Sequence, residues 1–176
     1  MNILLSETEQ NLLVLLEELT KHHDWIELPV LAEKLNFSTE ELQEHLFKLE
    51  QLFPNLLIQS TKEGIQLQFE ARNSLDPRIA IFEQSKTYSF LNRLFFKEGQ
   101  SLKQMCQELS TNTEHIEEII QHLNTKLPQH YAISIQLSPL VMGGTEENIR
   151  AFYLDYFSQS YDFLDWPFPS ISEESL

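Results

Sequence analysis

The feature that most constrains the fold of this chain is an internal repeat. The segment from Leu28 reads L-x-x-L-A-E-K-L-N-F-S-T-E-E-L, and the segment from Leu102 reads L-x-x-M-C-Q-E-L-S-T-N-T-E-H-I. The offset is 102 − 28 = 74 residues, and apolar positions match without a gap as far as Phe53 and Leu127. Self-similarity at a fixed offset indicates a structural unit that occurs twice. We therefore expect residues 28–69 and 102–142 to adopt the same structure.

In the first unit the pattern predicts a short helix, a turn and a second helix. Apolar residues spaced i, i+3, i+4 and i+7 predict one buried face for the first helix. Ser38 or Thr39 can cap the second helix, which is expected over residues 39–53, and Glu41 completes a capping box. The expected buried residues of the two helices are Leu28, Leu31, Ala32, Leu35, Leu42, Leu46, Leu49 and Phe53.

The second unit repeats this arrangement, and both units continue into β-prone runs. Asn112 or Thr113 is the expected cap of its second helix. The expected inner face of that helix consists of Ile116, Ile120, Leu123 and Leu127. The β-prone runs cover residues 56–59 and 65–69 in the first unit, and 131–137 and 140–142 in the second. Each pair predicts a β-hairpin, the wing of a winged helix-turn-helix.

Three further helices complete the expected architecture. Helices over residues 7–21 and 77–97 would close the two cores, and an aromatic helix over 145–160 would follow, with Phe152 and Phe157 in its core. Turn-forming residues near 72–76 place the boundary between the units. The predicted domains are residues 1–73 and 74–165, with 166–176 as a linker or tail. The expected fold is mainly α with small β wings, as tandem winged helix-turn-helix domains plus a C-terminal aromatic helix.

Composition and the absence of targeting patterns indicate a cytoplasmic protein. The single cysteine, Cys106, cannot form an internal disulfide, and it lies in an apolar helical pattern. No signal-peptide pattern is present at the N-terminus, and no apolar run approaches the roughly 20 residues that a membrane span needs. We expect no membrane association.

A stretch near the C-terminus resembles the Mga family of Gram-positive transcriptional regulators. Residues 140–157 read L-V-M-G-G-T-E-E-N-I-R-A-F-Y-L-D-Y-F, and W-P-F follows at 166–168. The second helix-turn-helix domain of that family carries a G-x-E-x-x-I-R segment, whose places are taken here by Gly144, Glu146, Ile149 and Arg150. The family begins with two consecutive helix-turn-helix units, so the resemblance extends over nearly the whole chain. It implies duplex DNA binding, a homodimer in the intact regulator, and regulatory phosphorylation in domains beyond this N-terminal region.

The charge of the chain opposes a simple DNA-binding interpretation. Its formal net charge is −15, whereas binding to phosphates depends on basic surfaces. The predicted outward face of helix 39–53 and its repeat counterpart are acidic, with Glu40, Gln43, Glu44 and Phe47 on one and Glu114, Glu117, Glu118 and Gln121 on the other. Carboxylates can accept a hydrogen bond from cytosine but are repelled by phosphates. A protein-interaction or oligomerisation module with degenerate DNA-binding helices therefore stays an alternative.

The candidate DNA-binding residues are polar side chains at helix starts and on the outward faces, with nearby cations. The set is Ser38, Thr39, Gln43, Lys48, Lys62, Asn112, Thr113, His115, Gln121 and Lys126. Lys34, Lys103 and Arg150 are further candidate phosphate contacts. We expect His45, His115 and His122 to lie on or beside the exposed faces. Clustering of Lys34, Lys62, Lys103 and Lys126 on one face would favour DNA; their scattering would favour the interaction module.

The sequence offers no pattern for catalysis or for a cofactor. It contains no Gly-rich phosphate loop and no G-x-S-x-G motif. His22 and His23 are adjacent, so on a helix they would point about a hundred degrees apart and make a poor pair of metal ligands. We expect no enzyme activity, no metal, no cofactor and no small-molecule substrate.

Overall fold

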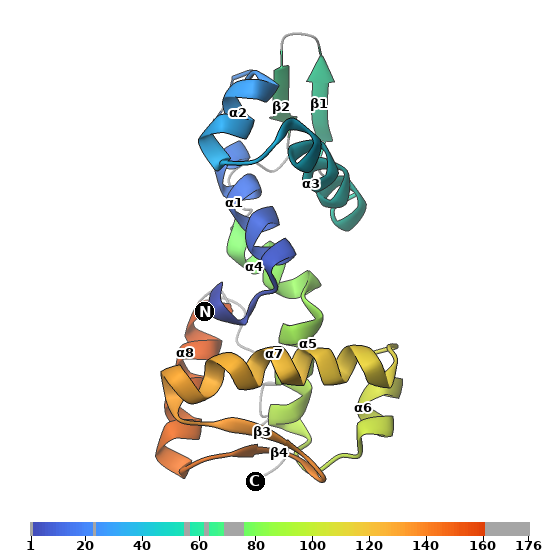
Figure 1. Cartoon of the computed structure of the whole chain (residues 1–176), viewed down its shortest axis with the longest axis vertical. Coiled ribbons are helices and arrows are strands. Elements are labelled where there is room, and N and C mark those ends of the chain that lie inside the picture. The colour runs from blue at the N-terminus through green and yellow to red at the C-terminus, as the bar shows by residue number, and fades with distance from the viewer. Residues whose placement is uncertain (1, 23, 55–56, 62–63, 69–75, 161–176) are drawn as a thin grey trace, which may run out of the picture. The chain divides into compact units, whose positions relative to one another are not determined.

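The computed structural model describes residues 2–22, 24–54, 57–61, 64–68 and 76–160. The chain is mainly helical, with two small antiparallel sheets (Figure 1). It divides into an N-terminal unit, Leu5–Ser85, and a C-terminal unit that joins the residues from Lys86 onward to the first four residues. The predicted fold class, mainly α with small β elements in tandem helix-turn-helix domains, is confirmed.

Helix α1 (Glu7–Lys21) leads the N-terminal unit. It begins at a capping box, in which the Ser6 side chain accepts a hydrogen bond from the backbone N–H of Glu9 and the Glu9 carboxylate accepts one from the backbone N–H of Ser6. Helix α4 (Pro77–Gln84) packs on α1. The buried leucines of α1, which form the centre of this unit, are Leu12, Leu13, Leu15, Leu16 and Leu19.

Helices α2 (Leu28–Leu35) and α3 (Thr39–Leu52) form the first helix-turn-helix. The predicted capping box at the start of α3 is confirmed, because the Ser38 hydroxyl accepts from the Glu41 N–H at 3.1 Å and the Glu41 carboxylate accepts from the Ser38 N–H at 2.8 Å. Asn36 ends α2 in the left-handed conformation. The inner face of α3, including Leu42 and Leu46, is buried as predicted.

Strands β1 (Leu57–Thr61) and β2 (Gly64–Gln68) pair antiparallel where the sequence predicts the first wing. Ile26 adds a short bridge to this pair: its N–H donates to the Ile65 carbonyl at 2.9 Å, and the Ile65 N–H donates back at 2.7 Å. Gly64 has φ +141°, and a Cβ at this position would overlap the carbonyl oxygen of Ile26. A glycine is therefore required where the wing meets this bridge.

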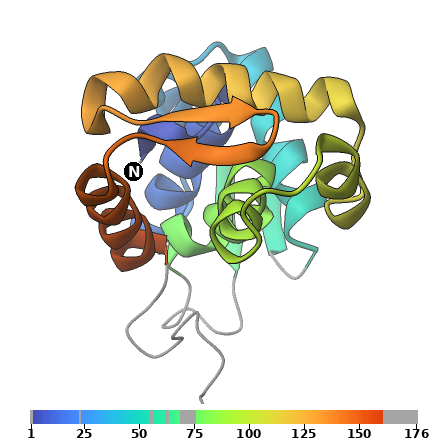
Figure 2. The same cartoon turned by 90° about the horizontal axis from the view of Figure 1, so that it is seen from below.

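The C-terminal unit contains the same order of elements. Its helices are α5 (Lys86–Phe96), α6 (Leu102–Glu108), α7 (Thr113–Tyr131) and α8 (Glu146–Ser160), and a short 3₁₀ helix, η1 (Asn2–Leu4), contacts α7. Strands β3 (Ser134–Leu137) and β4 (Leu140–Gly143) pair antiparallel and run along α7 (Figures 1 and 2). The predicted aromatic C-terminal helix is confirmed, with Phe152 fully buried and Phe157 half-buried.

The two helix-turn-helix segments agree in detail at the offset of 74 residues. Leu42 and Ile116 are both fully buried, as the repeat predicts. The turns share their geometry, since Asn36 and Ser110 both have positive φ, at 57° and 50°. A backbone contact recurs as well: the Leu140 N–H donates to the carbonyl of Gln100, the counterpart of Ile26 at this offset, at 3.3 Å.

The prediction of one helix over residues 77–97 is wrong. The chain forms α4 and α5, which are separated at Ser85, whose ψ of 125° is extended. Serine favours such extended positions at helix ends because its side chain competes for backbone hydrogen bonds. Only α5 leads the C-terminal unit, as α1 leads the N-terminal unit, while α4 belongs to the core around α1.

The prediction of a strand from Tyr131 is also wrong, because α7 continues through Pro128 and ends at Tyr131, with Ala132 as its cap. A proline removes one hydrogen bond to the carbonyl four residues earlier, and here the fully buried Leu127 holds the last turns in place. Strand β3 is tied to α7 instead by Asn124, whose carboxamide accepts from the Ile135 N–H at 2.7 Å and donates to its carbonyl at 3.0 Å.

We expect Gly64→Ala to lower the free energy of unfolding by about 2 kcal/mol or more, because positive φ and the overlap with Ile26 both oppose a side chain. Gly99→Ala is the matched control: Gly99 has φ +82° but no atom within 4 Å of a built Cβ, so strain alone should cost about 1 kcal/mol. Urea unfolding of the whole chain measures both. Equal losses for the two variants would contradict the close approach at Gly64.

We expect Leu46→Ala and Ile120→Ala each to cost roughly 2 to 5 kcal/mol, as is usual for large-to-small changes in a core. Both residues are buried at equivalent places in their units. Phe47→Ala serves as the control, because this neighbouring side chain on α3 is 61% exposed. A midpoint of thermal unfolding that stays unchanged in Leu46→Ala or Ile120→Ala would show that the apolar stripe does not hold the unit together.

Candidate nucleic-acid interface

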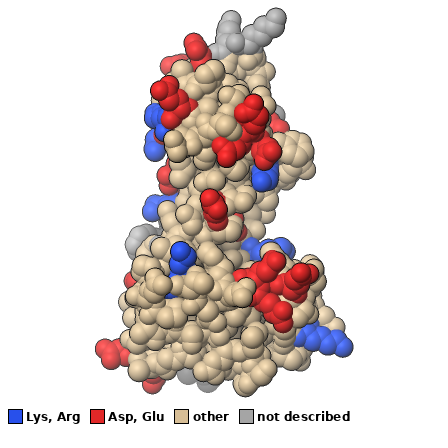
Figure 3. All heavy atoms as spheres, in the orientation of Figure 1, with Lys and Arg blue, Asp and Glu red and all other residues tan. Residues whose placement is uncertain are grey.

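The outer face of α3 is exposed and acidic, as the sequence predicts. Glu40, Gln43, Glu44 and Phe47 are all exposed, on the side of the helix opposite its buried residues. On the face that Figure 3 shows, acidic side chains gather over α3. The helix therefore presents the phenyl ring of Phe47 among carboxylates, with Lys48 next to it in the sequence.

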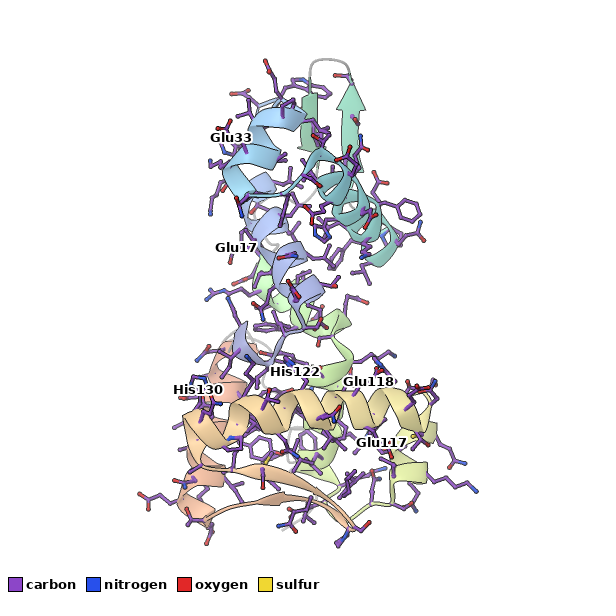
Figure 4. All side chains as sticks on the ribbon, viewed as in Figure 1. Glu17, Glu33, Glu117, Glu118, His122 and His130 are labelled. Atoms are coloured by element: carbon purple, nitrogen blue, oxygen red, sulfur yellow. The ribbon has the colours of Figure 1, made fainter. Side chains whose placement is uncertain are left out.

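The outer face of α7 has the same character. Glu114, Glu117, Glu118 and Gln121 are exposed, and the side chains of Glu117 and Glu118 lie at the N-terminal half of the helix (Figure 4). His115 approaches Glu118, with its Nδ1 3.3 Å from the carboxylate. Strands β3 and β4 and the turn between them carry no charged residue, so this hairpin cannot supply a cation to a phosphate.

The polar residues at the two helix starts act as caps. Ser38 accepts from Glu41, and the Asn112 carboxamide accepts from the His115 N–H at 2.8 Å. Thr39 and Thr113 are the first residues of α3 and α7, and both are exposed. Hydrogen bonds from the Ser38 backbone N–H and then its hydroxyl lower the pKa of the Glu41 carboxyl. A carboxylate thus already occupies the N-terminus of α3, where a phosphate would otherwise be favoured.

Several of the candidate phosphate contacts are engaged in ion pairs. Lys34 pairs with Glu18, and Arg150 pairs with Glu146 at 2.5 Å. Among the described residues, Lys48, Lys103 and Lys126 have no acidic partner within 4.0 Å. Of the candidate phosphate contacts that the structure describes, these three are the lysines left available to an incoming phosphate.

The lysines whose clustering would separate the two functional hypotheses lie in different parts of the chain. Lys34 is on α2 of the N-terminal unit, and Lys103 and Lys126 are on α6 and α7 of the C-terminal unit. Lys62 lies outside the described residues. Clustering of the four lysines on one face therefore remains the observation that would separate DNA binding from the interaction module.

The prediction that His45 lies at the exposed face of α3 is wrong, because its side chain is buried and the residue is 8% exposed. Its ring packs edge-on against Phe37 at 5.0 Å, and its Nδ1 has no hydrogen-bond partner within the described structure. Desolvation lowers the pKa of His45, and Lys48 adds to this effect, while Glu41 and Glu44 oppose it. The repeat predicts this burial, because the residue equivalent to His45 at the offset of 74 is the apolar Ile119, which is also buried. His115 and His122 are half-buried.

The described residues offer neither a metal site nor a membrane span. No group of three or more His, Cys, Asp or Glu side chains is placed to hold a metal ion in the described ranges. Within the same ranges, no helix has the length and apolar character that crossing a membrane requires.

The helix-turn-helix geometry agrees with the comparison to known families. Residues 6–65 match the family described as "M protein trans-acting positive regulator (MGA) HTH domain", and residues 76–157 match the "Mga helix-turn-helix domain". The chain belongs to the Mga family. The first match covers α1, α2, α3 and β1, and the second runs from Asp76, the cap of α4, into α8. The resemblance seen in the sequence is therefore confirmed over most of the chain.

Curated relatives in this family are described as regulators. A Streptococcus pneumoniae protein described as a trans-acting regulator is 32% identical over all of this chain and 36% of its own length. The capsule synthesis positive regulator AcpA of Bacillus anthracis is 21% identical over 92% of this chain and 34% of its own. AcpB of the same organism is 25% identical over 54% of this chain and 20% of its own. This Mga-family chain spans about a third of the length of the first of these relatives.

We expect the stability of the protein to fall as the pH drops below the ordinary histidine value of about 6.5, because His45 has a lowered pKa in the folded state. As the pH falls, His45 binds a proton in the unfolded chain before it does so in the folded chain. The contribution of the neutral ring to the free energy of unfolding is therefore complete above pH about 6.5 and is lost below it. His45→Ile, which copies the repeat counterpart, should reduce this loss. Thermal unfolding at pH 7.5 and 5.5 measures it.

His130→Gln is the control for this experiment, because His130 is exposed on α7 and should leave the acid-dependent loss unchanged. The interpretation fails if His45→Ile loses as much stability between the two pH values as the unchanged chain does.

Proposed function

We propose that this chain is a duplex-DNA-binding region of a transcriptional regulator and that it binds through two winged helix-turn-helix units. The observation that carries the proposal is the repeated placement of α3 and α7. In each unit one helix follows a short helix and a turn, buries one stripe, and leaves its opposite face exposed. This is how a helix-turn-helix offers its second helix to a major groove. Membership of a helix-turn-helix family of regulators supports the proposal.

In the proposed complex, polar side chains on α3 and α7 read base edges and residues at the helix starts bind phosphates. Gln43, Gln121 and His115 are the proposed base contacts, since side-chain amides and imidazole can donate and accept in the major groove. The proposed phosphate contacts are Ser38, Thr39, Asn112, Thr113, Lys48, Lys62 and Lys126. The proposed domains follow the sequence repeat and are residues 1–73 and 74–165, with 166–176 as a linker or tail; α4, at the start of the second, packs on α1 of the first.

The electrostatics of the chain predict weak DNA binding by one copy. The net charge of −15 opposes approach to phosphates, and Glu41 already neutralises the positive end of α3. A second copy would double the favourable contacts while both engage one duplex. We therefore propose that a homodimer, formed by the intact regulator, is the species that binds DNA in the cytoplasm. No catalytic activity, cofactor or small-molecule substrate is part of this proposal.

The second candidate function is a protein-interaction module with the same fold. It is favoured by the acidic outer faces, where Glu40 and Glu114, and Glu44 and Glu118, occupy equivalent places in the two units. It is favoured also by the pairing of Lys34 with Glu18 and of Arg150 with Glu146, which partly neutralises two exposed cations. Such faces would suit a basic protein surface better than a phosphate backbone.

We expect the double variant Glu40→Gln, Glu44→Gln to bind DNA more tightly than the unchanged chain and with little change in sequence preference, because two charges facing the duplex are removed. Lys48→Ala should weaken binding and lower the slope of affinity against salt concentration by about one, as for one lost phosphate contact. Affinity for duplex DNA is measured by fluorescence anisotropy at several salt concentrations, with the intact regulator that contains this chain.

The control is the double variant Glu33→Gln, Glu83→Gln, which makes the same change in net charge on α2 and α4. It should tighten binding less than the α3 variant. Weaker binding after the α3 substitutions would mean that the carboxylates contact base edges directly. If neither the α3 substitutions nor Lys48→Ala alters binding by a form that binds DNA, the N-terminal unit does not read DNA and the interaction-module interpretation applies to it.

A further inference from the structure

Both units join their leading helix to the next helix through an ion pair, but the pairs have opposite polarity. In the N-terminal unit the acid is on the leading helix: Glu18 of α1 binds Lys34 of α2. In the C-terminal unit the acid is on the following helix: Glu108 of α6 accepts from Arg93 at 2.8 Å and from Lys97 at 2.9 Å, both on α5. The same contact between helices is thus made twice with the charges exchanged.

The charged positions are structural equivalents. Lys34 and Glu108 are each the seventh residue of their helix and are separated by the repeat offset of 74. The leading helices correspond at an offset of 75, from Glu18 to Arg93, because their buried positions then coincide. These buried pairs are Leu12 and Thr87, Leu13 and Tyr88, Leu15 and Phe90, Leu16 and Leu91, and Leu19 and Leu94.

At the same offset His22 corresponds to Lys97, and each takes part in the ion cluster of its own unit. The His22 ring nitrogen lies 2.7 Å from the Glu18 carboxylate, and Lys97 binds Glu108. The exchange of charge is therefore confined to two pairs of equivalent positions, Glu18 with Arg93 and Lys34 with Glu108.

The buried apolar residues of α2 and α6 are alike at equivalent positions. Leu31 and Met105 are both fully buried at equivalent places, and the small residues Ala32 and Cys106 are buried beside them. Leu and Met exchange with little loss in a core, since they are similar in volume. The apolar surfaces of α2 and α6 are therefore similar, while the charges that these helices carry beside them, Lys34 and Glu108, are opposite.

We propose that the inverted polarity of these ion pairs keeps each helix-turn-helix on its own leading helix. If α6 packed on α1, Glu108 would face Glu18; if α2 packed on α5, Lys34 would face Arg93 and Lys97. Like charges in such contacts are repulsive, and the repulsion is screened least at Glu18, whose side chain is only 9% exposed. The correct pairing is therefore attractive in both units, and both wrong pairings are repulsive.

Such a device suits a chain that contains two copies of one motif. Repeated domains tend to misassemble, by pairing elements of the wrong copy or by exchanging them between molecules. Charged side chains select partners among otherwise similar helices, as they do in coiled coils, because wrong pairs are penalised. The inference concerns assembly of the two units and does not depend on what they bind.

The test exchanges the charges in one unit, in the other and in both. The first variant carries Glu18→Arg and Lys34→Glu, the second carries Arg93→Glu, Lys97→Glu and Glu108→Lys, and the third combines all five substitutions. In either of the first two variants both units have the same polarity, so wrong pairings become attractive. In the combined variant the polarities again differ, although every local change of the other two is present.

Each whole chain is unfolded in urea, refolded by dilution at two protein concentrations and separated by size exclusion. A second sample of each protein is kept out of urea. The fraction of refolded protein whose elution volume differs from that of this second sample measures wrong assembly. We expect the two single-unit variants to raise this fraction about fivefold over that of the unchanged chain, because a small difference in free energy between correct and wrong pairing gives a ratio of this size. We expect the combined variant to return the fraction to that of the unchanged chain.

The combined variant decides the outcome even where a single-unit variant does not fold. A fraction of wrong assembly in the combined variant as low as in the unchanged chain supports the proposal. Local damage at Glu18 and at Glu108 would instead add up in the combined variant and raise that fraction further. If the combined variant assembles as badly as the worse single-unit variant, or if both single-unit variants refold like the unchanged chain, the proposal is overturned.

Discussion

Burial of one apolar stripe on α3 and on α7 is the interaction on which the rest of each unit depends. The helices before them are short, at eight residues for α2 and seven for α6, and helices of that length are not stable alone in water. Leu42 and Ile116 are fully buried and provide the surface against which the neighbouring elements pack. Because these stripes use one side of the helix, the other side is left to solvent, and that side is the proposed interface.

The electrostatics of the molecule follow from how its few cations are used. Glu18 and Glu108 hold four of them, Lys21, Lys34, Arg93 and Lys97. The hydrogen bond from Lys34 is the largest of the effects that lower the pKa of the Glu18 carboxyl, so this group is charged in the folded protein although it is nearly buried. Cations that stabilise contacts between helices are not available to phosphates. Fewer cations are therefore left to offset the carboxylates on the outer faces of α3 and α7.

Buried polar groups distinguish the two units more than their apolar residues do. His45 occupies the place that Ile119 has in the other unit, and it brings a titratable ring into an otherwise apolar contact. In the C-terminal unit, the Tyr156 hydroxyl lies 2.9 Å from both the Tyr88 carbonyl and the Asn92 carboxamide oxygen and shares its one proton between them, within the aromatic contact of α5 and α8. Each unit thus adds its own polar feature to a shared arrangement of helices.

The sequence by itself determined the repeat, the helix starts and the inner faces, because these depend on residues close together in the chain. The spacing of Leu42 and Leu46 and the capping box at Ser38 are local properties of a helix. Only the tertiary structure decided the break at Ser85, the continuation of α7 through Pro128, the burial of His45 and the partners of Glu18 and Glu108. Each of these depends on elements far away in the sequence, whose packing and charge can override a local preference.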